Sequence, residues 1–191
     1  MSEQLINHFR RFVTIEEEDV NEILLFFRAL SVKKKQNLLE AGKQCRSHYF
    51  VVKGCLRLFF VNETGIEQTT QFALENWWMT DYAAYHSRQA SGFFIQAIEQ
   101  TDLMAIDHDA QETLFGKFPQ FEKYFRLIYQ RATAAAQVRI KYLYELSREE
   151  LYLQFRDLYP EFVQRVPQYL LASFLGFTPE YLSEIRRRSL S

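Results

Sequence analysis

The chain has 191 residues, an apolar fraction of 48% and a formal net charge of −1. This length supports one or two globular domains, and the near-neutral charge argues against a protein that simply coats nucleic acid. No stretch approaches the roughly 20 apolar residues needed to cross a bilayer, so we expect a cytoplasmic protein with no membrane partner.

The charges are unevenly distributed along the chain. Residues 1–119 contain twelve Lys and Arg against sixteen Asp and Glu, a net charge of −4. Residues 120–191 contain eleven against eight, a net charge of +3. This change of sign indicates an acidic module joined to a basic one.

In chain order, apolar residues at helical spacing predict two short amphipathic helices over residues 3–12 and 16–29. From about residue 42 the period becomes that of strands, and residues 42–109 are predicted to form an antiparallel barrel or jelly roll. Asn62–Gly65 has the composition of a hairpin turn, and Gly54 marks a second turn or bulge. The aromatic residues around Trp78 and Tyr82 are expected to fill a hydrophobic core.

Pro119 is predicted to open a helix that runs to about residue 147, with apolar residues three or four apart. Its length, about 40 Å at 1.5 Å per residue, exceeds what the core of a small domain needs. We therefore expect it to pair with the same helix of a second copy. The alanines at 134–136 would allow close approach, although helix propensity also explains them.

The last 25 residues have the local signals of a helix–turn–helix. Pro167 suits a first helical turn, and Gly176 stands where a left-handed residue would end that helix. Thr178 is expected to cap a second helix. Leu182 and Ile185, three residues apart, are predicted to face the first helix. The predicted fold is α+β: an antiparallel β-roll with flanking helices at residues 1–118, a long dimerisation helix at 119–147 and a helix–turn–helix domain at 148–191.

In a DNA-binding helix–turn–helix the second helix enters the major groove, where its side chains contact base edges and phosphates. The predicted double-stranded DNA contacts are Gln168, Thr178, Pro179, Glu180, Tyr181, Ser183, Glu184, Arg186, Arg187 and Arg188. The other explanation is an exposed surface helix, since cations suit a helix C-terminus and Glu184 can pair with Arg188. The combination of turn signals, apolar pattern and charge asymmetry favours DNA binding.

The sequence resembles the CRP/FNR family of bacterial transcription regulators. The resemblance covers nearly the whole chain and rests on YFVVKGCLRLFF, the NETG hairpin, IQAIEQTDLMAI and above all RVPQYLLASFLGFTPEYLSEIRRR. This last stretch is similar to the shortened regulators common in Bacteroidetes. The resemblance implies a homodimer that binds a two-fold-related DNA site and is switched by an effector or redox signal in the N-terminal domain.

Cyclic-nucleotide-binding members hold the ribose and cyclic phosphate with a Gly-Glu pair and a downstream arginine. The resemblance puts Thr80-Asp81 and Ser91-Gly92 at these positions, so the arginine is missing. Arg88 could replace it only if the loop were rearranged, and a buried phosphate needs a charged partner. We therefore expect a degenerate pocket that does not bind cyclic AMP in the usual mode, with an unidentified small molecule as the candidate effector. The candidate pocket residues are Thr80, Asp81, Arg88, Ser91, Gly92, Gln96 and Gln137.

No cofactor, metal site or catalytic activity is predicted. Cys45 and Cys55 are too few for an iron–sulfur cluster, and we expect them to be reduced, with Cys55 buried. The four histidines are far apart in the sequence, and each is expected at the surface or hydrogen-bonded. No feature of the sequence indicates a haem site. A metal enzyme of the cupin type would need clustered His and Glu, which these isolated histidines do not supply. The remaining alternative is a ligand-binding or interaction module whose DNA binding is weakened or lost.

Overall fold

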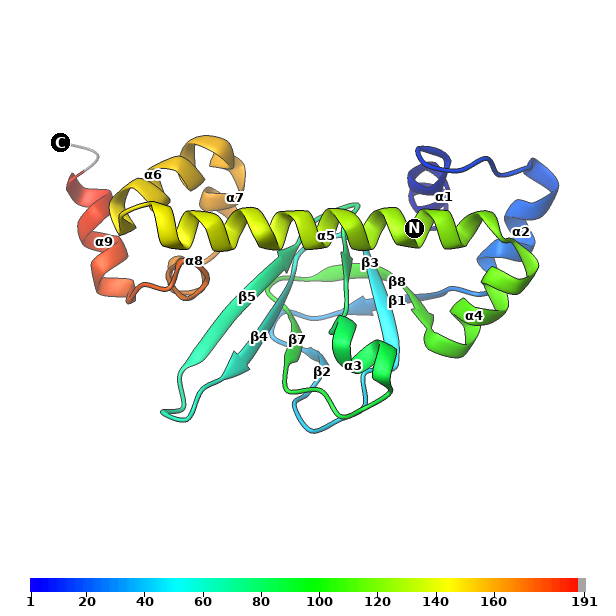
Figure 1. Ribbon diagram of the computed structural model, residues 1–191, viewed down its shortest axis with the longest axis horizontal. Coiled ribbons are helices and arrows are strands. Elements are labelled where there is room, and N and C mark those ends of the chain that lie inside the picture. Colours follow the sequence, from blue (N-terminus) through cyan, green and yellow to red (C-terminus); the bar gives the residue numbers. More distant parts are fainter. Residues whose placement is uncertain (189–191) are drawn as a thin grey trace. The chain divides into compact units, whose positions relative to one another are not determined.

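The structure is a computed structural model that describes residues 1–188 (Figure 1). The chain forms two compact units. Unit 1 comprises Met1–Phe60 and Thr70–Tyr129, and unit 2 comprises Val61–Thr69 and the residues from Gln130 onward. The elements in chain order are helix α1 (Ser2–Arg10), the 3-10 turn η1 (Glu17–Asp19), α2 (Val20–Leu24), strands β1 (Arg28–Val32), β2 (Asn37–Leu39), β3 (Ser47–Lys53), β4 (Leu56–Val61), β5 (Glu67–Ala73) and β6 (Trp78–Met79), α3 (Tyr82–Ser87), β7 (Phe94–Ala97), β8 (Thr101–Asp107), α4 (His108–Lys117), α5 (Gln120–Glu145), α6 (Arg148–Leu158), α7 (Pro160–Arg165), α8 (Gln168–Leu175) and α9 (Pro179–Arg188).

The strands form two four-stranded sheets, ordered β1-β8-β3-β6 and β2-β7-β4-β5. The strand pairs are antiparallel, as in β3 with β8, where Phe50 lies opposite Met104. The predicted antiparallel β-roll is therefore confirmed. Gly54 has a φ of 104°, and a Cβ there would lie 2.5 Å from Thr101 Oγ1, so this turn requires glycine.

Unit 1 has two hydrophobic cores, one on each face of β3. Tyr49 and Val51 pack into the interior of the β-roll. Phe50 and Val52 pack on the other side, against residues of α1, α4 and the first turns of α5. Figure 1 shows α1, α2 and α4 gathered around this beginning of α5. This alternation is the period of two that a strand buried on both faces produces.

Two of the predicted boundaries in unit 1 are wrong. The helix expected over 16–29 ends at Leu24, and β1 begins at Arg28, well before residue 42. The backbone of 28–32 is paired with Thr101–Ala105 of β8, so a partner far away in sequence overrides the local helical spacing. Helix α4 lies next to β8 and was not predicted.

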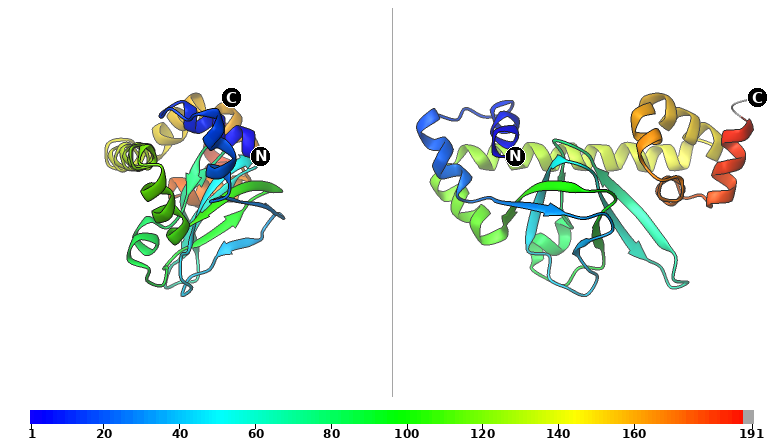
Figure 2. Two further views of the ribbon diagram at one scale, coloured as in Figure 1. Left: turned by 90° about the vertical axis from the view of Figure 1, so that its right-hand side faces the viewer. Right: turned by 180° about the vertical axis from the view of Figure 1, so that it is seen from behind.

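Unit 2 contains the end of α5 and the helices that follow it, as Figure 2 shows from two further sides. The long helix expected from Pro119 is present as α5. Ser147 and Glu150 form a reciprocal capping box at the start of α6, which fixes where one helix stops and the next begins. Pro160 then opens α7 after the break at Tyr159. The three-part domain division remains a prediction.

Candidate nucleic-acid interface and effector site

Helices α8 and α9 form the predicted helix–turn–helix. Gly176 is left-handed with a φ of 78°, and the N–H of Phe177 donates to the Ala172 carbonyl at 2.8 Å. This closure of the helix end is the one that a glycine at this position permits. Thr178 Oγ1 accepts a hydrogen bond from the Tyr181 N–H at 3.3 Å, as expected for a cap. Pro167 differs slightly from the prediction, because it precedes the first helical residue and has extended geometry.

The buried side of α9 is apolar and its outer side is polar. Leu182 and Ile185 are buried, as their spacing predicted. The predicted DNA contacts are exposed or half-buried; they are Gln168, Thr178, Pro179, Glu180, Tyr181, Ser183, Glu184, Arg186, Arg187 and Arg188. Glu184 forms an ion pair with Arg188 one turn later. The outer side is therefore cationic towards its C-terminal end and carries Glu180 at its N-terminal end.

Two arginines that the sequence analysis did not select hold this helix pair in place. Arg139 of α5 donates to the Phe174 carbonyl at 2.6 Å, and its guanidinium lies 4.3 Å from the centre of the Phe174 ring. Burial lowers the pKa of Arg139 from its usual value. Arg148 lies 5.6 Å from the centre of the Tyr181 ring, which joins the start of α6 to α9. Cation–π contacts of this kind orient a helix as well as stabilise it.

Ser173 of α8 binds the edge of β5. Its hydroxyl donates to the Glu67 carbonyl at 2.8 Å and accepts from the Thr69 N–H at 2.9 Å. These two backbone groups flank one residue of an edge strand, where they would otherwise lack partners in the sheet. A serine within the apolar stretch QYLLASFL was the sequence signal for this contact, and it was missed.

Replacing Ser173 by Ala is expected to lower the free energy of unfolding by about 1 kcal/mol and the melting temperature by roughly 2–4 °C, because two backbone groups lose their partner. Thermal denaturation measures the change. Ser183→Ala is the matched control, since its hydroxyl donates only to the Pro179 carbonyl within its own helix at 2.9 Å. Equal losses in both variants would contradict the Ser173 contact.

Three of the candidate effector residues lie together in unit 1. Asp81 caps α3, accepting from the Ala84 N–H at 3.2 Å and from the Ser91 hydroxyl at 2.7 Å. Thr80 is fully buried, and its hydroxyl donates to the Ser47 carbonyl at 3.0 Å and lies 3.2 Å from Cys45 Sγ. Burial raises the pKa of the Cys45 thiol. Asp81 is therefore bonded to Ser91, and Thr80 to Ser47 and Cys45; both cysteines are buried, as expected for Cys55.

The other candidate effector residues are not part of this group. Arg88 turns outward in a left-handed conformation and donates to Asp109 at 2.6 Å. Gly92 is exposed. Gln96 lies on the opposite face of β7 from Ile95, which points into the β-roll, and it accepts from Arg57 at 2.6 Å. Gln137 is exposed on the part of α5 that belongs to unit 2.

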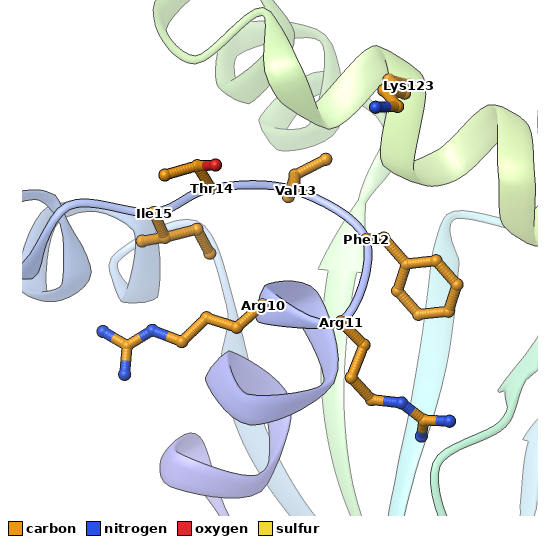
Figure 3. Close-up of a pocket in the computed structure, with 7 residues that line it drawn as sticks. All are labelled: Arg10, Arg11, Phe12, Val13, Thr14, Ile15 and Lys123. Carbon is orange, nitrogen blue, oxygen red and sulfur yellow. The ribbon is translucent and has the colours of Figure 1, made fainter.

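A pocket of about 480 Å³ lies in unit 1 between the end of α1 and α5 (Figure 3). It is lined by Arg10, Arg11, Phe12, Val13, Thr14, Ile15 and Lys123. Figure 3 shows that Arg10 and Arg11 point away from Lys123. Arg10 also donates to Glu17 at 2.6 Å. Because the three cations do not converge, this pocket is not built to hold an anion.

Comparison with known families and proteins gives consistent results. The family described as the cyclic nucleotide-binding domain matches residues 29–118. The regulatory protein HlyX of Actinobacillus pleuropneumoniae is 25% identical over 187 residues, which cover 92% of this chain and 77% of HlyX. The fumarate and nitrate reduction regulatory protein of Vibrio cholerae is also 25% identical over 187 residues, covering 92% and 74% of the two chains.

Solved structures share the fold. FixK2 from Bradyrhizobium japonicum superimposes with a TM-score of 0.70 at 16% identity, covering 85% of this chain and 83% of FixK2. The c-di-GMP-responsive global regulator CLP of Xanthomonas campestris superimposes with a TM-score of 0.73 at 14% identity, covering 92% of each chain. Within residues 1–188, no helix combines the length and the apolar character needed to cross a membrane.

Proposed function

We propose that this chain, a homologue of the CRP/FNR-type transcription regulators, is a homodimeric, sequence-specific DNA-binding regulator. It carries a cyclic nucleotide-binding domain. Its homologues are regulators, so we assign it no catalytic activity. The observation that carries the proposal is the outer side of α9. This side presents Arg187, with Arg186 and Arg188 on its flanks, while the buried Leu182 and Ile185 hold the helix from behind. An exposed cationic helix in this motif fits the major groove.

The second half of α5 supports the homodimer. One side of this part of α5 is half-buried and faces the rest of unit 2; its residues are Ala132, Arg139, Tyr142 and Leu146. Thr133, Gln137, Ile140 and Tyr144 lie on the other side, with the four-three-four spacing of a coiled-coil seam. Tyr144 is 90% exposed and Ile140 is 53% exposed. A second copy of this helix would bury both apolar side chains.

The test of the proposal is the salt dependence of binding to DNA fragments from the promoter region of its own gene. Each phosphate that an arginine neutralises adds about 0.9 to the slope of log affinity against log salt. Fluorescence anisotropy with labelled duplexes at increasing salt is expected to give a steep decline in affinity. A flat dependence, or no binding at low salt, would instead favour a ligand-binding or interaction module; the Glu184–Arg188 ion pair favours that alternative because it occupies one arginine.

We also propose that the effector pocket does not accept cyclic AMP in the usual mode. Ser91 stands where the resemblance puts the phosphate-binding arginine, and its hydroxyl is already bonded to Asp81. Arg88 is held outside by Asp109. A cyclic phosphate bound next to Asp81 would meet a carboxylate instead of a guanidinium, which is unfavourable in a buried site.

Cyclic AMP at about 1 mM is therefore expected to leave the melting temperature unchanged, because a ligand that does not bind the native state cannot stabilise it. Differential scanning fluorimetry with and without the nucleotide measures this, and 5′-AMP at the same concentration controls for non-specific anion effects. A rise of several degrees with cyclic AMP alone would show that another residue has replaced the missing arginine.

A further inference from the structure

Several buried polar atoms of unit 1 are gathered in one place without hydrogen bonds. In the part of the chain that the structure describes, no partner is found for Nδ1 and Nε2 of His48, the hydroxyl of Tyr82 or Nε2 of Gln111. His48 is fully buried and Gln111 is 3% exposed. These groups come from three separate elements, β3, α3 and α4, so their meeting is a product of the fold.

The rings around His48 link these groups into a single cluster. The centre of the imidazole lies 5.6 Å from that of Tyr82, 5.9 Å from that of Tyr85 and 6.0 Å from that of Tyr129, with which it is stacked. Tyr85 donates its hydroxyl proton to Gln111 Oε1 at 3.0 Å, which brings the Gln111 amide to the same place. We call His48, Tyr82, Tyr85, Gln111 and Tyr129 the His48 cluster.

A second buried histidine in unit 1 shows the usual arrangement. His8 also lies among aromatic rings, but its Nδ1 is 2.7 Å from the Tyr124 hydroxyl. Buried polar groups are almost always paired in this way, because an unpaired group loses its hydrogen bonds to water and gains none. The His48 cluster departs from this rule at several atoms at once. A partner from outside the chain would account for all of them together.

We propose that the His48 cluster binds a small, uncharged molecule that both donates and accepts hydrogen bonds. The cluster offers the matching groups: the Gln111 amide donates, the Tyr82 hydroxyl does both, and a neutral imidazole has one donor and one acceptor. Burial lowers the pKa of His48 to about 3, so the ring is neutral at physiological pH. An ionic ligand would be left without a counter-charge from these side chains.

The His48 cluster shares no residue with the candidate effector pocket, although Tyr85 also packs into the core of the β-roll. His48 lies on the face of β3 that also carries Phe50, whereas Tyr49 and Val51 point into the β-roll. Ser91 donates to Asp81 and Thr80 donates to the Ser47 carbonyl, so the hydrogen bonds of these three residues do not involve the His48 ring. Binding here does not depend on DNA binding, so either proposal can fail without the other.

Phenol is the probe for the experiment, because it is flat, uncharged and carries one hydroxyl that donates and accepts; benzene, which lacks the hydroxyl, is its control. At ten times its dissociation constant, phenol is expected to raise the melting temperature of the full chain by roughly 3–6 °C, and benzene by less. His48→Phe and Tyr82→Phe are expected to abolish the difference between phenol and benzene. His8→Phe, a matched buried histidine outside the cluster, is expected to preserve it.

Crystals soaked in phenol are expected to show its hydroxyl within hydrogen-bond distance of the His48 cluster. The proposal is overturned if phenol and benzene stabilise the chain equally, or if neither does. It is also overturned if the phenol effect survives both cluster variants. Soaked crystals with only ordered water at these atoms would overturn it as well, since water would then be the partner of the cluster.

Discussion

Replacing Arg186, Arg187 and Arg188 together by Ala is expected to weaken binding to promoter DNA by about 100-fold or more at moderate salt. A 100-fold loss of affinity corresponds to about 2.7 kcal/mol. Hydrogen bonds to charged groups contribute about 1.5–3 kcal/mol each, so the loss of three such groups reaches this energy even after screening by salt. The salt dependence should fall as well, by roughly one unit of slope per lost phosphate contact. Fluorescence anisotropy over a range of salt concentrations measures both quantities.

The melting temperature of this triple variant is expected to change little. Arg187 and Arg188 are exposed and Arg186 is half-buried, and the ion pair of Arg188 with Glu184 is a surface pair one turn apart, worth about 0.3–0.5 kcal/mol. Replacement of Lys33, Lys34 and Lys43 by Ala removes the same formal charge from exposed positions of unit 1 and is the matched control. If both variants lose DNA affinity equally, net charge explains the binding and α9 is not the contacting helix.

The helix–turn–helix could be predicted because its signals are local. Gly176, Thr178 and the spacing of Leu182 and Ile185 determine the turn and the buried face within a dozen residues. The end of the helix expected over 16–29 was misassigned, because β1 begins at Arg28 and its conformation depends on β8, about seventy residues away. Apolar spacing contains no information about such a partner.

The effector site was harder to predict, for two geometric reasons. A one-residue shift along a strand reverses the direction of a side chain, and Gln96 therefore lies on the face opposite Ile95. Arg88 adopts a left-handed conformation that directs it to Asp109, and nothing in the spacing indicates this. The expectation that each histidine is exposed or hydrogen-bonded is correct for His8 and wrong for His48.

Replacing Ile140 and Tyr144 together by Glu is expected to convert a dimer into a monomer of 22.9 kDa. Both side chains are exposed within the chain, so the substitutions remove no buried contact and should not unfold unit 2. In the dimer, four carboxylates would be brought together along one seam, where like charges repel and lose hydration. Analytical ultracentrifugation at micromolar concentration measures the mass.

Val138→Glu is the control for this variant, because Val138 is also exposed on α5 but lies about 160° around the helix from Ile140. It is expected to remain dimeric. The monomeric double variant should also lose most of its affinity for a two-fold-related DNA site, since each copy then binds one half-site without the effective concentration that the partner provides. A variant that stays dimeric would place the interface elsewhere. A monomer with undiminished DNA affinity would mean that one helix–turn–helix is sufficient for binding.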